Sequence, residues 1–228
     1  MNDKDASDAE SDEPCPLCLA GDTILIDRNT SREFYRCEHC GLVHVPKRFF
    51  LSADEEFRIY ELHENDIFDP GYRGFLNRLF QPIAERTAPD ACGLDFGCGP
   101  GPALATMFRE RGNTMDVFDP FYANHPHVLQ RKFDFVTSTE VLEHLHHPWR
   151  EIQQLWNCVR PGGVMGIMTK RIPKEACDRF SDWFYTIDPT HVAFYADRTF
   201  EWLAGKLNGT LELLRSDVAV IRKKTCES

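Results

Sequence analysis

The sequence predicts an α/β protein in which a mostly parallel, doubly wound sheet follows a small N-terminal cysteine module. Three observations support this fold class. Residues 93–102 have the composition of a buried strand end, a glycine turn and a helix start. Apolar strand patterns and helix patterns then alternate as far as residue 169. Two Cys-x2-Cys pairs precede this region.

The glycine turn contains Gly97, Cys98, Gly99 and Gly101. Its glycines allow a sharp turn and a close approach of the backbone to a ligand. The Gly-x-Gly-x-Gly spacing differs from the phosphate-binding Gly-x-Gly-x-x-Gly, and no Gly-Lys-Ser/Thr follows. Asp95 precedes the first glycine by two residues, and its carboxylate would repel a pyrophosphate but would suit an ammonium group. S-adenosylmethionine carries an ammonium, a carboxylate and a sulfonium, and no phosphate.

A second acid follows the next predicted strand. Residues 114–118 have a strand pattern, and Asp119 comes directly after them. A carboxylate at this place can accept hydrogen bonds from both hydroxyls of a ribose. The alternative is a glycine turn and an unrelated surface Asp. Because loop and acid occur in the expected order, we favour a nucleoside-binding site.

Four segments carry a family resemblance: residues 94–101, Asp119, residues 133–145 and residues 160–163. With them, the chain from about residue 89 onward resembles a class I S-adenosylmethionine-dependent methyltransferase. The resemblance implies a Rossmann-like fold with an antiparallel closing strand pair. It implies that the glycine turn and Asp119 bind the cofactor, and that Thr139 and Glu140, after the fourth strand, lie beside it.

The sequence departs from this family between Asp119 and Phe133. Only thirteen residues separate them, where a helix, a third strand and a loop normally fit. We therefore expect the third strand to be reduced. The acid that family members often use near adenine has no counterpart, so we expect adenine to pack on Phe118, Pro120 or Phe121.

Length and charge restrict the function. With 228 residues the chain can hold one main domain and a small satellite. The net charge is −10, of which residues 1–13, with six acids and one lysine, contribute −5. We expect these residues to be a disordered tail. The acidic balance makes a nucleic acid partner unlikely. The absence of a long apolar run or signal peptide predicts a cytoplasmic protein without a membrane span.

Residues 14–46 predict a zinc ribbon. Eighteen residues separate the pair Cys15 and Cys18 from the pair Cys37 and Cys40. This spacing is typical of four thiolates around one structural zinc ion. His39 or His44 could replace a thiolate, but four cysteines already suffice. The alternative is four unrelated buried cysteines, which this spacing disfavours.

Residues 47–88 predict a helical connector that covers the cofactor. Ser52 and Glu55 form a capping-box pattern, and a second helix carries apolar residues from Phe75 to Phe80. Its polar candidates for the acceptor pocket are Tyr60, His63, Asn65 and Tyr72. A packed connector with a solvated turn is an equal alternative. The domain from 89 to 228 would then bind S-adenosylmethionine.

The turn after the strand at 133–138 contains Glu143-His144 and His146-His147. These residues could suggest a metal, but we favour a helix cap and surface histidines, because the sequence shows no matching ligand cluster. Residues 152–159 predict an amphipathic helix, which Pro161-Gly162-Gly163 ends before a strand at 164–169.

Residues 171–195 predict a long aromatic loop that covers the acceptor and screens the sulfonium. His191 in this loop is the candidate catalytic base, because a histidine titrates near neutral pH. The alternative is that His191 only ties the loop to a backbone carbonyl. Asp197 would then cap a helix, and residues 211–214 and 218–221 would form the closing strands.

We therefore expect a methyltransferase that acts on a small-molecule or carrier-bound acceptor. One alternative is a zinc-ribbon adaptor whose methyltransferase-like domain is not catalytic. A second alternative is an RNA methyltransferase, which the acidic charge and the lack of an Asn-Pro-Pro-Tyr-type motif after Ser138 disfavour.

Overall fold

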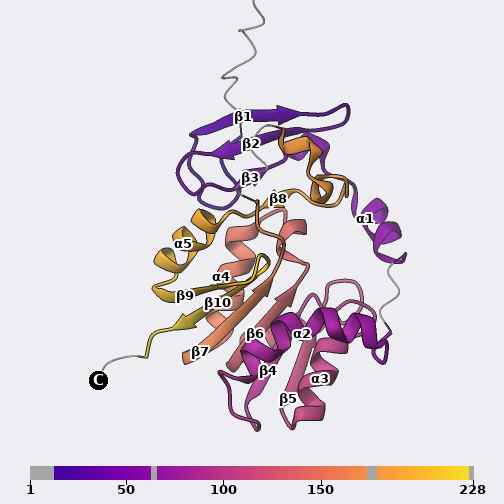
Figure 1. Ribbon diagram of the computed structural model, residues 1–228, viewed down its shortest axis with the longest axis vertical. Helices are drawn as coiled ribbons and strands as arrows, with labels where there is room; N and C mark the ends of the chain where they lie inside the picture. The colour runs from indigo at the N-terminus through magenta and orange to yellow at the C-terminus, as the bar shows by residue number, and fades with distance from the viewer. Residues whose placement is uncertain (1–12, 63–65, 174–178, 226–228) are drawn as a thin grey trace, which may run out of the picture.

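The computed structural model describes residues 13–62, 66–173 and 179–225. Its centre is a six-stranded sheet with the order β5-β4-β6-β7-β10-β9 (Figure 1). The strands are β4 (Cys92–Phe96), β5 (Thr114–Phe118), β6 (Phe133–Thr139), β7 (Val159–Met168), β9 (Gly209–Leu214) and β10 (Val218–Lys223). The first four are parallel, and β10 runs antiparallel to both neighbours. The predicted fold class is confirmed.

Helices cover both faces of this sheet. Helices α2 (Pro70–Ala84) and α3 (Ala103–Arg111) share one apolar core with Phe135 of β6. Helices α4 (Pro148–Cys158) and α5 (Asp197–Lys206) share the other core with the next residue, Val136. Successive strand residues point to opposite faces, so the apolar run of β6 supplies both cores.

The third strand of the family is missing. The chain between β5 and β6 forms a turn and a short 3₁₀ helix, η2 (Pro126–Gln130). Strand β5 therefore stays at the edge of the sheet, as the thirteen-residue spacing predicts.

A second, four-stranded sheet has the order β1-β2-β3-β8. Strands β1 (Thr23–Arg28), β2 (Glu33–Cys37) and β3 (Val43–His44) come from the N-terminal module, whereas β8 (Ala193–Phe194) comes from the predicted aromatic loop. Figure 1 shows this sheet at one end of the molecule. The rest of that loop carries two 3₁₀ helices, η4 (Phe180–Asp182) and η5 (Phe184–Thr186). Phe180, Tyr185 and Phe194 pack against Phe34 of β2 in a separate core.

The connector begins with the 3₁₀ helix η1 (Lys47–Phe49) and contains helix α1 (Ala53–Tyr60). The Glu55 carboxylate accepts from the Ser52 backbone N–H at 2.9 Å, so the predicted capping box forms. Helix α2 begins at Pro70, and Asp69 caps it by accepting from the Tyr72 N–H at 2.5 Å. The acidic tail, apart from Glu13, and the candidates His63 and Asn65 lie outside the described residues.

Two local predictions are wrong. The Pro161-Gly162-Gly163 segment does not form a separate turn, because α4 ends at Cys158 and β7 already begins at Val159 with a shift in register. Asp197 does not cap α5; its carboxylate pairs with the Arg171 guanidinium at 2.6 Å. The Thr199 hydroxyl accepts from the Ala196 N–H at the start of that helix instead. Among the described residues, no helix is long and apolar enough to span a membrane.

Candidate active site

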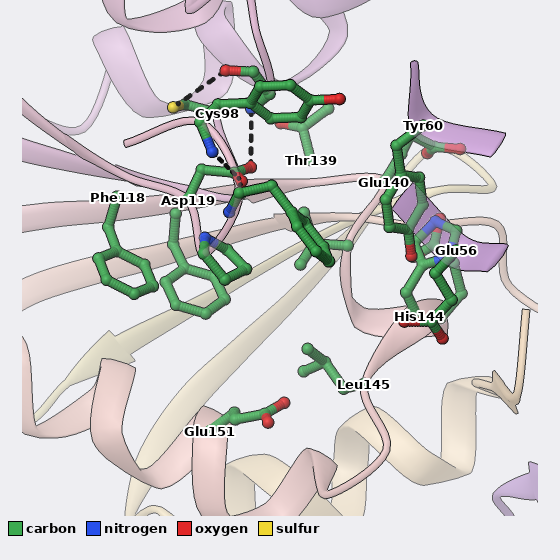
Figure 2. Close-up of a pocket in the computed structure, with 18 of the residues that line it drawn as sticks. Glu56, Tyr60, Cys98, Phe118, Asp119, Thr139, Glu140, His144, Leu145 and Glu151 are labelled. Atoms are coloured by element: carbon green, nitrogen blue, oxygen red, sulfur yellow. Dashed lines mark hydrogen bonds between the residues drawn. The ribbon is translucent and has the colours of Figure 1, made fainter. Parts of the chain in front are cut away.

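A cavity of about 850 Å³ lies at the carboxyl ends of β4, β5 and β6, and helix α1 lies over it. This edge of a parallel sheet is where ligands bind in such folds. In Figure 2, Cys98 and Asp119 lie on one side of the cavity, and Tyr60 and His144 lie on the other. The volume is near the upper end of the range of roughly 300–1,000 Å³ for small-molecule sites. The cavity therefore has room for a cofactor and a small acceptor.

The glycine turn forms one wall of the cavity. Gly97 and Gly99 have φ angles of +75° and +63°, which favour glycine. A Cβ on Gly97 would lie 2.2 Å from Cγ2 of Val141, so the turn also needs glycine for close packing. Gly97, Cys98 and Gly99 line the cavity, whereas Gly101 does not.

Asp119 joins the end of β5 to the glycine turn. Its Oδ2 accepts from the Gly99 N–H at 3.0 Å, and its Oδ1 accepts from the N–H groups of Phe121 and Tyr122 at 2.9 and 3.1 Å. A carboxylate has about four acceptor positions. The side chain is thus fixed in place, and Oδ2 keeps capacity for one further donor.

Asp95 lies behind the glycine turn and does not line the cavity. It is 4% exposed, and its Oδ1 accepts from the Thr137 hydroxyl at 2.9 Å. Burial raises the pKa of its carboxyl to about 6, although the Thr137 hydrogen bond lowers it. Because Asp95 does not line the cavity, its carboxyl group has no direct contact with the space where a ligand would bind.

Thr139 and Glu140 lie at the cavity at the end of β6. Glu140 has a φ of +51°, and its N–H donates to the Met168 carbonyl at 2.7 Å, which fixes the turn. Burial, and then the neighbouring Glu143, raise the pKa of Glu140 to about 8. Its Oε1 is buried without a hydrogen-bond partner among the described residues.

The expected aromatic cover comes from other elements. In the described part of the 171–195 segment, only Asp188 and His191 line the cavity, because Phe180, Tyr185 and Phe194 pack against the N-terminal module and Phe184 is exposed. The Tyr and Phe residues at the cavity are Tyr60 of α1, Tyr72 and Phe75 of α2, Phe96 at the end of β4, and Phe118, Phe121 and Tyr122 around the end of β5. Tyr60 and Tyr72 are thus two of the predicted connector residues.

His191 lies beside His144, with ring centroids 4.8 Å apart, and Figure 2 shows His144 across the cavity from Asp119. His191 is 7% exposed, and its Nδ1 lies 2.8 Å from the Tyr185 carbonyl oxygen, so Nδ1 is the donor and Nε2 carries the lone pair. Burial lowers the pKa of the ring, which keeps it neutral near pH 7. One ring nitrogen thus ties the loop to a backbone carbonyl, and the ring also lines the cavity, so the role of His191 as a base stays a prediction.

His191 is part of a cluster that the sequence did not reveal. Glu143 and His144 of the 3₁₀ helix η3 (Leu142–His144) and His191 each offer a ligand atom, and these atoms lie within 4.8 Å of one another. The Tyr185 hydroxyl donates to Glu143. The expectation that Glu143 and His144 lack a matching ligand is therefore wrong, because the fold brings His191 to them.

Arg32 holds the segment that carries His191. Its side chain, in the turn between β1 and β2, is 6% exposed. The guanidinium donates to the carbonyl oxygens of Asp188 at 2.9 Å, His191 at 2.8 Å and Pro189 at 3.3 Å, and also to that of Thr186. The N-terminal module therefore fixes the backbone on one side of the cavity.

The four predicted metal ligands come together at the edge of the N-terminal module. Their sulfurs lie within 4.8 Å of one another, with Cys15 and Cys40 at 3.6 Å and Cys18 and Cys37 at 3.3 Å. Zinc–sulfur bonds of about 2.3 Å in a tetrahedron need sulfurs about 3.8 Å apart. Leu19 has a φ of +62° where the second pair has Gly41 at +77°, so both pairs form the same turn. The cluster fits one tetrahedral ion.

Comparisons with known proteins agree with this architecture. A family described as a methyltransferase domain matches residues 68–212. A 1,6-didemethyltoxoflavin-N1-methyltransferase from Burkholderia thailandensis, solved with its substrate and S-adenosylhomocysteine, is 14% identical. That match covers 86% of this chain and 97% of that one, with a TM-score of 0.52, and it supports the fold.

Two further solved structures are less similar. A magnesium protoporphyrin IX methyltransferase from Synechocystis PCC 6803 is 13% identical, with 75% of this chain and 94% of that one covered and a TM-score of 0.46. An O-methyltransferase family protein from Burkholderia thailandensis is 15% identical with a TM-score of 0.46; the match covers 70% of this chain and 62% of that one. No curated protein matches the chain.

Replacement of Arg32 by Met should loosen the backbone around His191, because four carbonyl oxygens lose the guanidinium and only that of Asp188 keeps a backbone donor, the His191 N–H at 3.3 Å. Each buried acceptor without a partner costs about 1–3 kcal/mol. We expect amide hydrogen exchange across residues 184–192 to become about tenfold faster or more, with α3 unchanged. Arg36→Met, which removes an exposed arginine from the adjacent strand, is the control. Equal exchange in Arg32→Met and Arg36→Met would contradict this role.

Asp95→Asn should change how stability depends on pH. The folded protein keeps the Asp95 proton up to a pKa of about 6, whereas the unfolded chain loses it near 3.8. This carboxyl therefore stabilises the fold at low pH, and its contribution disappears as the pH rises from about 4 to 6. We expect the free energy of unfolding of Asp95→Asn, relative to wild type, to increase by about 2 kcal/mol between pH 4 and pH 7. Urea unfolding at each pH measures it, and a constant difference would exclude the elevated pKa.

Proposed function

This chain belongs to the methyltransferase family that matches residues 68–212, and we propose that it moves a methyl group from S-adenosylmethionine to a small-molecule or carrier-bound acceptor. Family membership confirms the enzyme class that the sequence predicts. The hydrogen bond from Gly99 to Asp119 carries the proposal for the cofactor. It brings the glycine turn and a fixed carboxylate together at the cavity, in an arrangement without the features of a phosphate site.

In this proposal, Oδ2 of Asp119 binds the ribose, and the backbone of Gly97, Cys98 and Gly99 passes along the methionyl part. Phe118, Pro120 and Phe121 line the cavity near Asp119 and are the surfaces for adenine. Asp95 lies behind the glycine turn, so its effect on the ammonium group is indirect or through water. Thr139 and Glu140 face the cofactor from the end of β6.

The acceptor would bind at the opposite end of the cavity, where His191 lies. An oxygen or nitrogen lone pair of the acceptor attacks the methyl carbon, and the new bond forms as the carbon–sulfur bond breaks. The bonding electron pair passes to sulfur, which leaves neutral S-adenosylhomocysteine. Without another base, Nε2 of His191 takes the acceptor's proton, because the ring is neutral and Nδ1 is bound to a carbonyl.

The charges around the cavity support a small acceptor. Glu56, Glu140, Glu143, Glu151 and Asp188 line it. A polyanionic nucleic acid would meet these acidic side chains, of which Glu140, with a pKa of about 8, is protonated near pH 7, so the RNA alternative remains disfavoured. The seven cysteines in the described part of the chain are not in disulfides, which supports a reducing, cytoplasmic location as part of the proposal.

We also propose that Cys15, Cys18, Cys37 and Cys40 bind one structural zinc ion. Four thiolates complete the tetrahedral coordination of the ion and leave no open coordination position for a substrate. The ion would stabilise the turns that hold β2 and β3, because a module this small has little core of its own.

Titration calorimetry with S-adenosylhomocysteine tests the cofactor site. We expect wild type to bind with a micromolar Kd, about −8 kcal/mol, and Asp119→Ala to lose at least tenfold in affinity, because the ribose contact and the fixed glycine turn are both removed. Circular dichroism establishes that the variant is folded, and Asp116→Asn, which changes a half-buried acid of β5 that pairs with Arg131, is the control. Failure of folded wild type to bind would overturn the proposed enzyme and favour the adaptor alternative.

Metal analysis tests the ribbon. We expect about one zinc ion per chain in protein purified without chelators, and a clear loss in Cys37→Ser, because three thiolates hold the ion less tightly. Cys158→Ser, which changes a buried cysteine on α4, should keep the wild-type zinc content. Zinc-free wild type, or full zinc content in Cys37→Ser, would refute the assignment.

A further inference from the structure

The cluster of Glu143, His144 and His191 lies at the acceptor end of the cavity. All three residues line the cavity, and their ligand atoms lie within 4.8 Å of one another. Two imidazoles and one carboxylate are a common ligand set for a divalent metal with open coordination positions. The distances and the residue types therefore both match a metal site.

The hydrogen bonds behind the cluster orient both imidazoles. Nδ1 of His191 lies 2.8 Å from the Tyr185 carbonyl oxygen, and Nδ1 of His144 lies 3.2 Å from the Thr190 carbonyl oxygen. Histidines that bind metals usually donate their other N–H to a carbonyl or carboxylate in this way. With Nδ1 directed at a carbonyl, Nε2 of each ring is the nitrogen that would bind the metal.

The carboxylate of the cluster is buried and incompletely paired. Glu143 is 0% exposed, and although Tyr185 donates to one of its oxygens, Oε2 has no hydrogen-bond partner among the described residues. Two more carboxyl groups lie near the cluster: Oδ2 of Asp188 is 3.8 Å from Nε2 of His191, and Oε2 of Glu140 is 3.4 Å from the Tyr185 hydroxyl. When such a side chain is ionised, a counter-charge, further hydrogen bonds or a bound cation must offset its lost hydration, and a cation at Oε2 would do so.

We propose that Glu143, His144 and His191 bind a divalent cation that coordinates an oxygen atom of the acceptor. This inference rests on the proposed function and makes the acceptor a hydroxyl or enol. The cation would lower the pKa of the coordinated hydroxyl, so that the proton leaves to water and the oxygen attacks the methyl carbon. The oxidation state of the metal does not change. In this mechanism His191 is a metal ligand and does not take the acceptor's proton. Coordination of the acceptor oxygen by the cation makes the oxygen nucleophilic instead.

Electron paramagnetic resonance with Mn²⁺ tests the site. The protein is the full chain with zinc already in its cysteine site, and Mn²⁺ prefers nitrogen and oxygen ligands to thiolates. We expect one Mn²⁺ per chain, and about tenfold or greater loss of affinity in both Glu143→Gln and His191→Asn. The matched control is Glu56→Gln, because Glu56 pairs with His146 at 2.9 Å in the same cavity but outside the cluster. It should bind Mn²⁺ like wild type.

Calorimetry with S-adenosylhomocysteine on the same samples separates the two proposals. Wild type that binds this ligand but not Mn²⁺ would overturn the cation site alone. Mn²⁺ binding that is equal in wild type, Glu143→Gln and His191→Asn would overturn it as well. Wild type that fails to bind S-adenosylhomocysteine would overturn the proposed function, whatever the Mn²⁺ result. If circular dichroism shows that either Glu143→Gln or His191→Asn is misfolded, the Mn²⁺ affinity of the other variant tests the site.

Discussion

The guanidinium of Arg32 connects the two parts of this protein. It is buried among backbone carbonyl oxygens of residues 186–191, and a planar group with five N–H donors suits such a set of acceptors. The adjacent backbone adds to the link: the Val45 N–H donates to the Val192 carbonyl, and the Val192 N–H donates to the Glu143 carbonyl. The N-terminal module thus supports the same residues that line one end of the cavity.

The other end of the cavity depends on a shorter connection. The Asp119 carboxylate accepts hydrogen bonds from backbone N–H groups of its own turn and of the glycine turn, so the ends of β4 and β5 are fixed relative to each other. The two ends of the cavity are therefore held by different means. Local turn chemistry holds the proposed cofactor side, whereas contacts between distant parts of the chain hold the proposed acceptor side. A structural change in the N-terminal module would therefore affect the proposed acceptor side of the cavity before the proposed cofactor side.

This difference explains how much of the protein could be predicted. The large sheet, the reduced third strand and the nearness of the glycine turn to Asp119 follow from local patterns and short spacings. The pairing of β3 with β8 does not, because each strand has two residues and about 150 residues lie between them. The same long-range contact hides the meeting of His191 with Glu143 and His144. Capping of α5 was mispredicted because Arg171, distant from the helix start in sequence, pairs with Asp197.

The position of β8 in the small sheet also affects the order in which the protein can fold during synthesis. Strands β1, β2 and β3 leave the ribosome long before residues 193–194 exist, so β3 emerges with an unpaired edge. At roughly 5–20 residues per second, this edge stays open for several seconds to tens of seconds. Unpaired edges invite association with other chains, and here the edge is only two residues long, which limits that risk. The module that contains β1, β2 and β3 is thus completed only after most of the larger domain has been made.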